Sequence, residues 1–579
     1  MRTAIIQQGG ISARAIAGSH TVLLALDATA EAREGLRGFA IRRQAGQGAP
    51  RWLTGSKVFR AVTPNPEPGR NYSSREQPIQ SLIWGDYTAK PGMTYVFRVV
   101  PLYGNPGSLT EGPAVELDVT TETEGGATHS IWFNRGAIAS QAFAERFDNL
   151  PPPEPDNPEH EQTAWLSRGL LEACLRFIDE TPAGDGLRVA AYEFTYPPII
   201  MALKAAHERG VDLKVVYEAG QMTVKGERVD TEATKSAATA LKAHGFPTKV
   251  LIKRTKRANI PHNKFIVRLN ADRQPQAVWT GSTNFTPSGF LGQANVGHQV
   301  DDPHVAGQFL GYWEILAGDP EPAAGRAAVE GLTPDPPDSG PASGVTCVFS
   351  PRSKKDLLQW YAARIAEARQ TVLFTGAFGV NETLARAFSI DRDFLRYILL
   401  EKPPTHKTKA LLGDDRDLIV VPGQVLGDVW TKNKKGELTL RRPIPGFELE
   451  RWFLDEEHYR AKGNIFFVHT KFMVIDPLSD DPVVITGSAN FSDASLLSND
   501  ENMMVIRGNT RVADIYLTEF DRLIRHFYFR DIAAKFHGGG AGANAKFLDE
   551  TDEWLEPYFR SGGFKDRRRR LFMATSSPQ

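Results

Sequence analysis

The fold is decided by a short stretch that this chain carries twice. The first copy reads Pro261-His262-Asn263-Lys264-Phe265-Ile266-Val267, and the second reads Val468-His469-Thr470-Lys471-Phe472-Met473-Val474. Each copy is followed by a turn, Gly281-Ser282-Thr283-Asn284-Phe285 in the first and Gly487-Ser488-Ala489-Asn490-Phe491 in the second. The separation from His to Asn is 22 residues in one copy and 21 in the other. This agreement in residue type, order and spacing indicates an internal duplication.

The chemistry of the repeated residues points to a phosphodiester. In a strand, His-x-Lys places both side chains on one face, because side chains alternate with a period of two. A lysine neutralises phosphate oxygens, and amide and hydroxyl groups donate hydrogen bonds to charge that develops in the transition state. One imidazole cannot attack phosphorus and protonate the leaving oxygen at the same time, but two can share these tasks. We therefore predict a catalytic set of His262, Lys264, Asn284, His469, Lys471 and Asn490, with Ser282 and Ser488 binding substrate.

At these motifs the chain resembles the phospholipase D superfamily, whose signature is a doubled H-x-K-x4-D followed by G-S-x-N. The second copy has its aspartate at Asp476, whereas the first has Leu269 at the matching position. The resemblance implies an α/β fold of two similar α/β/α halves, related by a pseudo-twofold axis, with one active site at their junction. It also implies a covalent phosphohistidine intermediate and no metal or other cofactor.

The resemblance extends to one further position in each copy, which in this family supplies the partner of the second imidazole nitrogen. Asn295 lies 33 residues after His262, and Glu501 lies 32 residues after His469. We therefore predict that Asn295 orients His262 as the neutral nucleophile. A carboxylate raises the pKa of a histidine, so Glu501 is predicted to hold His469 as the general acid.

The rest of the chain divides around this duplication. A strand at 187–194, a helix at 199–209 and a strand at 211–217 form a βαβ unit, which predicts a parallel or mixed sheet covered by helices. We place the first half at 128–320, the second at 345–535 and a proline-rich linker at 318–344.

The two ends of the chain differ from this catalytic unit. Residues 1–122 carry short alternating runs separated by turns, which predicts an all-β sandwich. The segment 90–99 resembles the tyrosine-corner strand of fibronectin type III domains. This domain has no catalytic residues, so we interpret it as an accessory or protein-docking module. Residues 536–579, with the run Arg567 to Arg570, are expected to form a solvated tail without fixed structure.

Composition narrows the classes of function. The chain has 68 basic and 69 acidic residues, so it lacks the overall positive charge typical of many nucleic-acid-binding proteins. Two cysteines exclude a disulfide scaffold or a cysteine-based zinc cluster. No signal peptide or long apolar run is present, which favours a cytoplasmic location.

Three functions stay open on the sequence alone. The first is phospholipase D-type cleavage of a phospholipid headgroup, with peripheral contact to a membrane. The second is cleavage of nucleic acid, for which the run Lys253-Arg254-Thr255-Lys256-Arg257 could contact phosphates, although the same run could be a solvated loop. The third is a binding or scaffold protein with a residual site.

Overall fold

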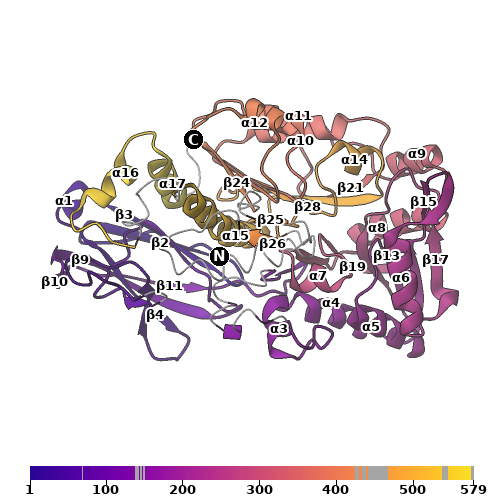
Figure 1. Ribbon diagram of the computed structural model, residues 1–579, viewed down its shortest axis with the longest axis horizontal. Helices are drawn as coiled ribbons and strands as arrows, with labels where there is room; N and C mark the ends of the chain where they lie inside the picture. Colours follow the sequence, from indigo (N-terminus) through magenta and orange to yellow (C-terminus); the bar gives the residue numbers. More distant parts are fainter. Residues whose placement is uncertain are drawn as a thin grey trace.

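The computed structural model describes most of the chain (Figure 1). The described residues are 1–67, 70–136, 143, 146–147, 150, 152–423, 430–432, 438–440, 467–536 and 546–574, with only the backbone described for 430–432, 438–440 and 529–536. Figure 1 shows the strand-rich N-terminal region at the left, the first half of the catalytic unit at the right and the second half at the top.

The N-terminal region contains a two-stranded sheet formed by β6 (Thr54–Gly55) and β7 (Tyr72–Ser73) and two larger antiparallel sheets. One has the order β1-β2-β3-β8, and the other has the order β10-β9-β4-β5 with β11 also paired to β9. The hydroxyl of Tyr95 accepts a hydrogen bond of 2.7 Å from the backbone N–H of Lys90, the contact expected of a tyrosine corner. An all-β N-terminal region is therefore confirmed, and its membership of the fibronectin type III class stays a prediction. The strands are β1 (Ile6–Gln8), β2 (Ile11–Ala17), β3 (Val22–Ala28), β4 (Gly38–Ala45), β5 (Arg51–Trp52), β8 (Ile83–Asp86), β9 (Thr94–Asn105), β10 (Ser108–Glu111) and β11 (Val115–Thr120).

The first half is a seven-stranded mixed sheet with the order β12-β20-β19-β18-β13-β14-β17. The predicted βαβ unit is confirmed, because β13 pairs parallel to β14 through the connecting helix α5. The strands are β12 (His129–Phe133), β13 (Gly186–Ala191), β14 (Asp212–Glu218), β17 (Leu251–Arg254), β18 (Lys264–Leu269), β19 (Pro275–Gly281) and β20 (Val296–Val300). The helices are α3 (Glu161–Ser167), α4 (Leu170–Asp179), α5 (Pro197–Glu208), α6 (Glu232–Ala243), α7 (Pro287–Leu291) and α8 (Pro303–Ala317).

The second half repeats this topology strand for strand, with the order β21-β29-β28-β27-β22-β23-β24. The duplication inferred from the motifs thus extends to whole α/β sheets. The strands are β21 (Gly344–Ser350), β22 (Thr371–Gly376), β23 (Leu395–Leu400), β24 (Leu418–Pro422), β27 (Phe472–Ile475), β28 (Val483–Gly487) and β29 (Glu501–Arg507). The helices are α10 (Asp356–Glu367), α11 (Glu382–Phe388), α12 (His406–Leu412), α14 (Asp493–Leu497) and α15 (Thr510–Phe536).

Three apolar cores lie within and between the two halves. One outer core packs α4 and α5 on the first sheet, and another packs α10 and α11 on the second. The third and largest lies between the sheets and contains Phe309 and Tyr312 of α8 together with Tyr516 and Phe520 of α15. Each sheet is therefore covered by helices on both faces, as the predicted α/β/α halves require. Among the described residues, no helix is both long and apolar enough to cross a bilayer.

Two segments are more ordered than the sequence suggested. The proline-rich linker contains the helix α9 (Pro322–Leu332), which begins at a proline, a residue well suited to the first helical turn. The expected C-terminal tail forms η3 (Glu553–Leu555), α16 (Glu556–Phe559) and α17 (Phe564–Met573). In α17, Arg567 pairs with Asp393, Arg568 with Asp521, and Arg569 with Asp27. The expectation of a tail without fixed structure is wrong for the described residues, because distant carboxylates neutralise the arginines.

Candidate active site

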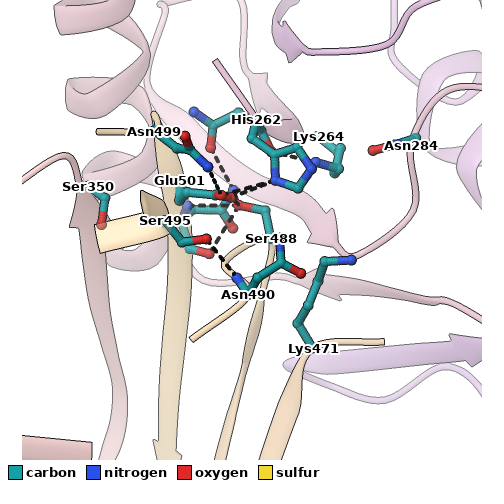
Figure 2. A network of polar contacts seen from close by, with 12 residues as sticks. His262, Lys264, Asn284, Ser350, Lys471, Ser488, Asn490, Ser495, Asn499 and Glu501 are labelled. Carbon is teal, nitrogen blue, oxygen red and sulfur yellow. Dashed lines mark hydrogen bonds and ion pairs between the residues drawn. The ribbon is translucent and has the colours of Figure 1, made fainter. Parts of the chain in front are cut away.

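The site lies where the two sheets meet, and each half contributes one histidine to it. His262 immediately precedes Asn263 and β18, and His469 lies three residues before β27, so the two copies enter the site at the same point of the topology. Both imidazoles are buried, at 5% and 4% exposure. Figure 2 shows His262 together with Lys264, Lys471, Asn490 and Glu501 around one small volume.

Each histidine is held by a residue from the opposite half. Nδ1 of His262 lies 2.9 Å from Oε2 and 3.0 Å from Oε1 of Glu501 (Figure 2). Nδ1 of His469 lies 2.9 Å from Oδ1 of Asn295. The predicted pairing of His262 with Asn295 and of His469 with Glu501 is therefore wrong, although the four residues do belong together.

Backbone hydrogen bonds across the interface explain the exchange. Ala294 donates to the carbonyl of Phe467 at 2.8 Å, and His469 donates to the carbonyl of Ala294 at 3.2 Å. In the other direction, Asp500 donates to the carbonyl of Ile260 at 3.0 Å. The residue before each partner is thus tied to the segment that leads to the histidine of the opposite half. The number of residues between a histidine and a partner position in the same half gives no information about contacts with the opposite half.

The serines of the two turns hold these partners in place. The hydroxyl of Ser282 donates to Oδ1 of Asn295 at 2.8 Å, and the hydroxyl of Ser488 donates to Oε2 of Glu501 at 2.7 Å. Each hydroxyl also accepts a backbone N–H from the neighbouring strand, Ser282 from Val296 and Ser488 from Asn502. Both side chains are fully buried. The serines thus contact the partners of both histidines, and their predicted contact with substrate stays a prediction.

Both lysines are buried and point back to the backbone of their own motif. Nζ of Lys264 donates to the carbonyl of His262, and Nζ of Lys471 donates to the carbonyl of His469 at 2.6 Å. Burial lowers the pKa of Lys264 to about 8 and lowers the pKa of Lys471 well below its usual value. Two desolvated ammonium groups at one point form a site that favours an anion.

Burial also sets the protonation of the histidines in the free protein. It lowers the pKa of His262 to about 4, although Glu501 acts in the opposite direction. It also lowers the pKa of His469 well below its usual value, and there the nearby lysines add to the effect. Burial raises the pKa of Glu501, but the hydrogen-bonded His262 and Lys264 outweigh it, so this carboxyl stays ionised. Both imidazoles are therefore neutral at pH 7 in the free protein.

The predicted asparagines complete the site. The amide nitrogen of Asn284 donates to the carboxylate of Glu193, and the backbone N–H of Asn490 donates to Ser495 at 3.1 Å. Within the described part of the chain, the side-chain oxygen of each asparagine is buried without a hydrogen-bond partner. Such buried polar atoms are rare in native proteins unless a ligand or water satisfies them.

Leu269 and Asp476 lie at the end of the motif strand away from the histidines. Asp476 accepts backbone N–H groups from Gln370 at 2.7 Å, Thr371 at 3.0 Å and Arg369 at 2.9 Å, and so fixes the start of β22. Leu269 is instead buried in the core opposite Gly186 of β13. The loss of the aspartate in the first copy therefore changes a structural contact and leaves the site intact.

Replacing Asp476 by Asn is expected to lower the free energy of unfolding by about 1–3 kcal/mol, because an amide offers one acceptor where the carboxylate offers two. Asparagine tolerates the left-handed backbone conformation of this position, where φ is 47°. Urea denaturation measures the loss, with the exposed Asp480→Asn as the control. A variant as stable as the wild type would contradict this role.

Further residues of the site lie close to the predicted ones. Asn499 donates to Oε1 of Glu501 at 3.0 Å, and Arg254 binds Asp500 at 2.9 Å, so both support the position of Glu501. Asn499 and Asp500 are neighbours of Glu501 in sequence, which is the only signal that could have marked them. Tyr192 packs its ring 5.3 Å from that of His262.

The basic run before His262 is largely committed to internal ion pairs. Arg254 binds Asp500 and Asp319, Arg257 binds the buried Glu218, and Lys256 lies 3.2 Å from Glu321. These pairs link the βαβ unit to the interface. They leave few charges in this run for an external polyanion.

One acidic cluster in the described residues has the spacing of a metal site, namely Asp391, Asp415 and Asp417. It lies at the start of β23 and β24, whereas the histidines lie near the other end of these strands. Arg396 pairs with Asp415, and Arg567 pairs with Asp417. The arginines already balance the charge of this cluster.

Comparisons with known proteins agree with this geometry. The family model described as cardiolipin synthase, PLD-like domain, matches residues 177–315 and 446–524, which include both histidines. No curated protein matches the chain significantly.

Solved structures with similarity to the chain include three from bacteria. Phosphatidylserine synthase from Haemophilus influenzae is 11% identical, over 70% of this chain and 94% of that one, with a TM-score of 0.41. Nuc from Salmonella typhimurium, a phospholipase D family member, is 28% identical over 26% of this chain and 86% of its own, with a TM-score of 0.20. Polyphosphate kinase from Porphyromonas gingivalis is 12% identical over 59% of this chain, with a TM-score of 0.37, and the alignment spans only 46% of that kinase. From the match of the family model to segments of both halves and the assembly of both motifs at one site, we conclude that the two halves form a phospholipase D-like domain.

Proposed function

We propose that this protein is a metal-independent phosphodiester hydrolase that works through a covalent phosphohistidine, with phospholipid headgroup cleavage of the phospholipase D type as its reaction. The observation that carries the proposal is the pair of buried histidines, each fixed at Nδ1 by a partner from the opposite half. With Nδ1 engaged, Nε2 of each ring is the atom left for chemistry.

We assign His262 as the nucleophile. Glu501 accepts the Nδ1 proton of His262, so the lone pair of Nε2 is available to attack phosphorus. When the P–N bond forms, the ring becomes positively charged, and the ionised Glu501 stabilises that charge. The sequence predicted this role for His262 from a neutral amide partner. The observed partner is the carboxylate of Glu501, which supports the same role by stabilising the charged intermediate.

His469 is assigned as the general acid and then the general base. As the bond from phosphorus to the leaving oxygen breaks, Nε2 of His469 gives that oxygen a proton. In the second step the same atom takes a proton from water, the hydroxide attacks phosphorus, and the P–N bond breaks. The amide of Asn295, unlike a carboxylate, carries no charge that would stabilise a protonated His469, so the imidazolium gives up its proton readily. The phosphate of the substrate supplies the negative charge that keeps this ring protonated.

The two lysines and two asparagines bind the phosphate in this scheme. Lys264 and Lys471 neutralise its non-bridging oxygens from two sides, and the amides of Asn284 and Asn490 provide hydrogen bonds. The competing proposal of a nuclease loses support from the basic run, because Arg254 and Arg257 already form buried ion pairs.

The test is hydrolysis by the purified protein, with EDTA present, of phosphatidylcholine, phosphatidylglycerol and single-stranded DNA. We expect release of the headgroup from phospholipid and loss of that activity in His469→Ala. Cleavage of DNA alone would support the nuclease instead. If His469→Ala were as active as the wild type, the protein would be better described as a binding or scaffold protein with a residual site. A chemical step that requires a divalent metal would contradict the mechanism. An added alcohol that appears in the lipid product would show transfer beside hydrolysis.

A further inference from the structure

Next to the pair of His262 and Glu501, a second pair of side chains joins the two halves. Asn263 follows His262 directly in sequence, and Asn502 follows Glu501 directly. The amide nitrogen of Asn502 donates to the side-chain oxygen of Asn263 at 2.8 Å. Both residues are buried, at 0% and 1% exposure. The interface therefore has two adjacent contacts here, one between an imidazole and a carboxylate and one between two amides.

The two amides belong to a longer chain of hydrogen bonds in which every donor points the same way. The hydroxyl of Thr280 donates to Asn502 at 2.7 Å, and the amide nitrogen of Asn263 donates to the hydroxyl of Tyr312 at 3.0 Å. Tyr312 in turn donates to the backbone carbonyl of Ser350 at 2.7 Å. This chain crosses the interface more than once, because Asn502 and Ser350 belong to the second half and the other residues to the first. Hydrogen bonds in such a chain strengthen one another, which favours one fixed arrangement.

The duplicated fold does not require this amide pair. Beside His469 and its partner, the positions that match Asn263 and Asn502 hold Thr470 and Val296. A valine side chain forms no hydrogen bond, and within the described part of the chain the hydroxyl of Thr470 is buried without a partner. Of the two pairs of described residues, the polar link is thus present beside the histidine that we assign as the nucleophile and absent beside the other.

A neutral link suits a histidine whose charge changes during the reaction. When the P–N bond forms, the ring of His262 becomes positively charged and its attraction to Glu501 increases. The amide pair carries no charge, so its hydrogen bond persists and holds the two segments at a constant separation. This separation matters for the rate, because a misplacement of about 1 Å can cost about 10²-fold.

We propose that Asn263 and Asn502 position the nucleophile: their hydrogen bond holds His262 where Nε2 attacks phosphorus while Nδ1 stays bonded to Glu501. The two asparagines contact neither the phosphate nor the reacting atoms, so they are positioning residues that act through the pair of His262 and Glu501. The proposal rests on the proposed function and adds residues outside the repeated motif to those that the reaction needs. A contact that only stabilised the interface would affect stability and leave the chemical step unchanged.

The experiment measures kcat and KM separately for hydrolysis of bis(4-nitrophenyl) phosphate, a soluble diester. In Asn502→Val, which introduces the residue found at Val296, we expect kcat to fall by about 10²-fold. KM should stay close to that of the wild type, because the lysines that bind the phosphate are unchanged. Thr470→Val is the matched control: it removes a buried hydroxyl from the position that corresponds to Asn263, and its kcat should equal that of the wild type.

A double-mutant cycle with Glu501→Gln separates positioning from a purely structural effect. If the amide pair acts through the contact of His262 with Glu501, little remains to be lost once this contact is impaired. We therefore expect Asn502→Val to lower kcat by less than about threefold in the Glu501→Gln background.

The double variant Asn263→Thr/Asn502→Val tests whether a folding defect causes the loss. It introduces the two residues that the other pair carries, and removing both partners of a buried hydrogen bond costs less stability than removing one. We expect its midpoint of urea denaturation to lie closer to that of the wild type than the midpoint of Asn502→Val does. Its kcat should nevertheless stay reduced by about 10²-fold.

The outcomes separate this proposal from the proposed function. If the wild type does not hydrolyse the diester, the proposed function fails. If the wild type does hydrolyse it, the positioning role alone is refuted by a kcat of Asn502→Val within about threefold of the wild type. The same conclusion follows if the full loss recurs in the Glu501→Gln background, or if the double variant regains kcat together with its stability.

Discussion

Replacing His262 by Asn is expected to lower kcat for diester hydrolysis by about 10⁴-fold or more. Asparagine cannot form the covalent bond to phosphorus, so both steps of the reaction lose their intermediate. The side chain is buried against Glu501, and asparagine is smaller and polar, so it keeps a hydrogen-bonding group in that place. Steady-state kinetics of the hydrolysis of bis(4-nitrophenyl) phosphate measures the loss, and circular dichroism shows whether the variant is folded.

The matched control is His304→Asn, an exposed histidine at the start of α8. Its kcat should equal that of the wild type. The buried His298 is a less suitable control, because it hydrogen-bonds His129 at 2.9 Å and Tyr516 at 3.2 Å in the core. Activity of His262→Asn within tenfold of the wild type would be incompatible with a nucleophilic His262.

Replacing Glu501 by Gln is expected to lower kcat/KM at pH 7 by about 10³-fold, as for other histidines that lose a carboxylate partner. Both oxygens of Glu501 accept hydrogen bonds, one from Asn499 and one from Ser488, besides His262. In either orientation, the amide nitrogen of glutamine therefore faces a hydrogen-bond donor, Asn499 or Ser488. The variant also lacks the charge that stabilises the phosphohistidine.

The same substitution should move the pH profile in a defined direction. Burial holds the pKa of Lys264 at about 8, and Glu501 is the first of the charges that raise it. Without this carboxylate the pKa of Lys264 falls below about 8, so the lysine loses its proton at a lower pH. The decline of kcat/KM on the basic side should therefore begin at lower pH in Glu501→Gln than in the wild type. An unchanged basic limb would show that Lys264 does not control it, and Glu227→Gln on the exposed ribbon strand β16 (Glu227–Asp230) is the control.

The sequence was sufficient for the parts of this structure that depend on local pattern. His-x-Lys before an apolar run predicts a buried strand with two polar groups at its end, and β18 and β27 have this form. Repetition of the pattern with conserved spacing predicts the second sheet. Both sheets then have the same strand order, because the second half repeats the pattern of the first.

The pairing of the histidines could not be predicted in this way, because it depends on the interface between the halves. Asn295 is close to His262 in sequence but bonds His469, owing to the backbone bonds of Ala294 across the junction. The arginines of α17 are similar: their charge suggests a solvated tail, and their partner Asp27 lies in the N-terminal region. The contacts of Ser282 and Ser488 with Asn295 and Glu501 could not be predicted for a related reason, since a short turn gives no indication of which strand its hydroxyls face.

The central claim is that the halves share one reaction, with His262 as nucleophile and His469 as acid and base. It is tested most directly by trapping the intermediate in His469→Asn with a diester that has a good leaving group and a radiolabelled phosphate. This leaving group needs no proton, so the first step proceeds, and the loss of the base stops the second. The account predicts stoichiometric label on the peptide that contains His262, stable to base and labile to acid. No label on His262 in His469→Asn, together with label on His469 in the reciprocal variant His262→Asn, would contradict it.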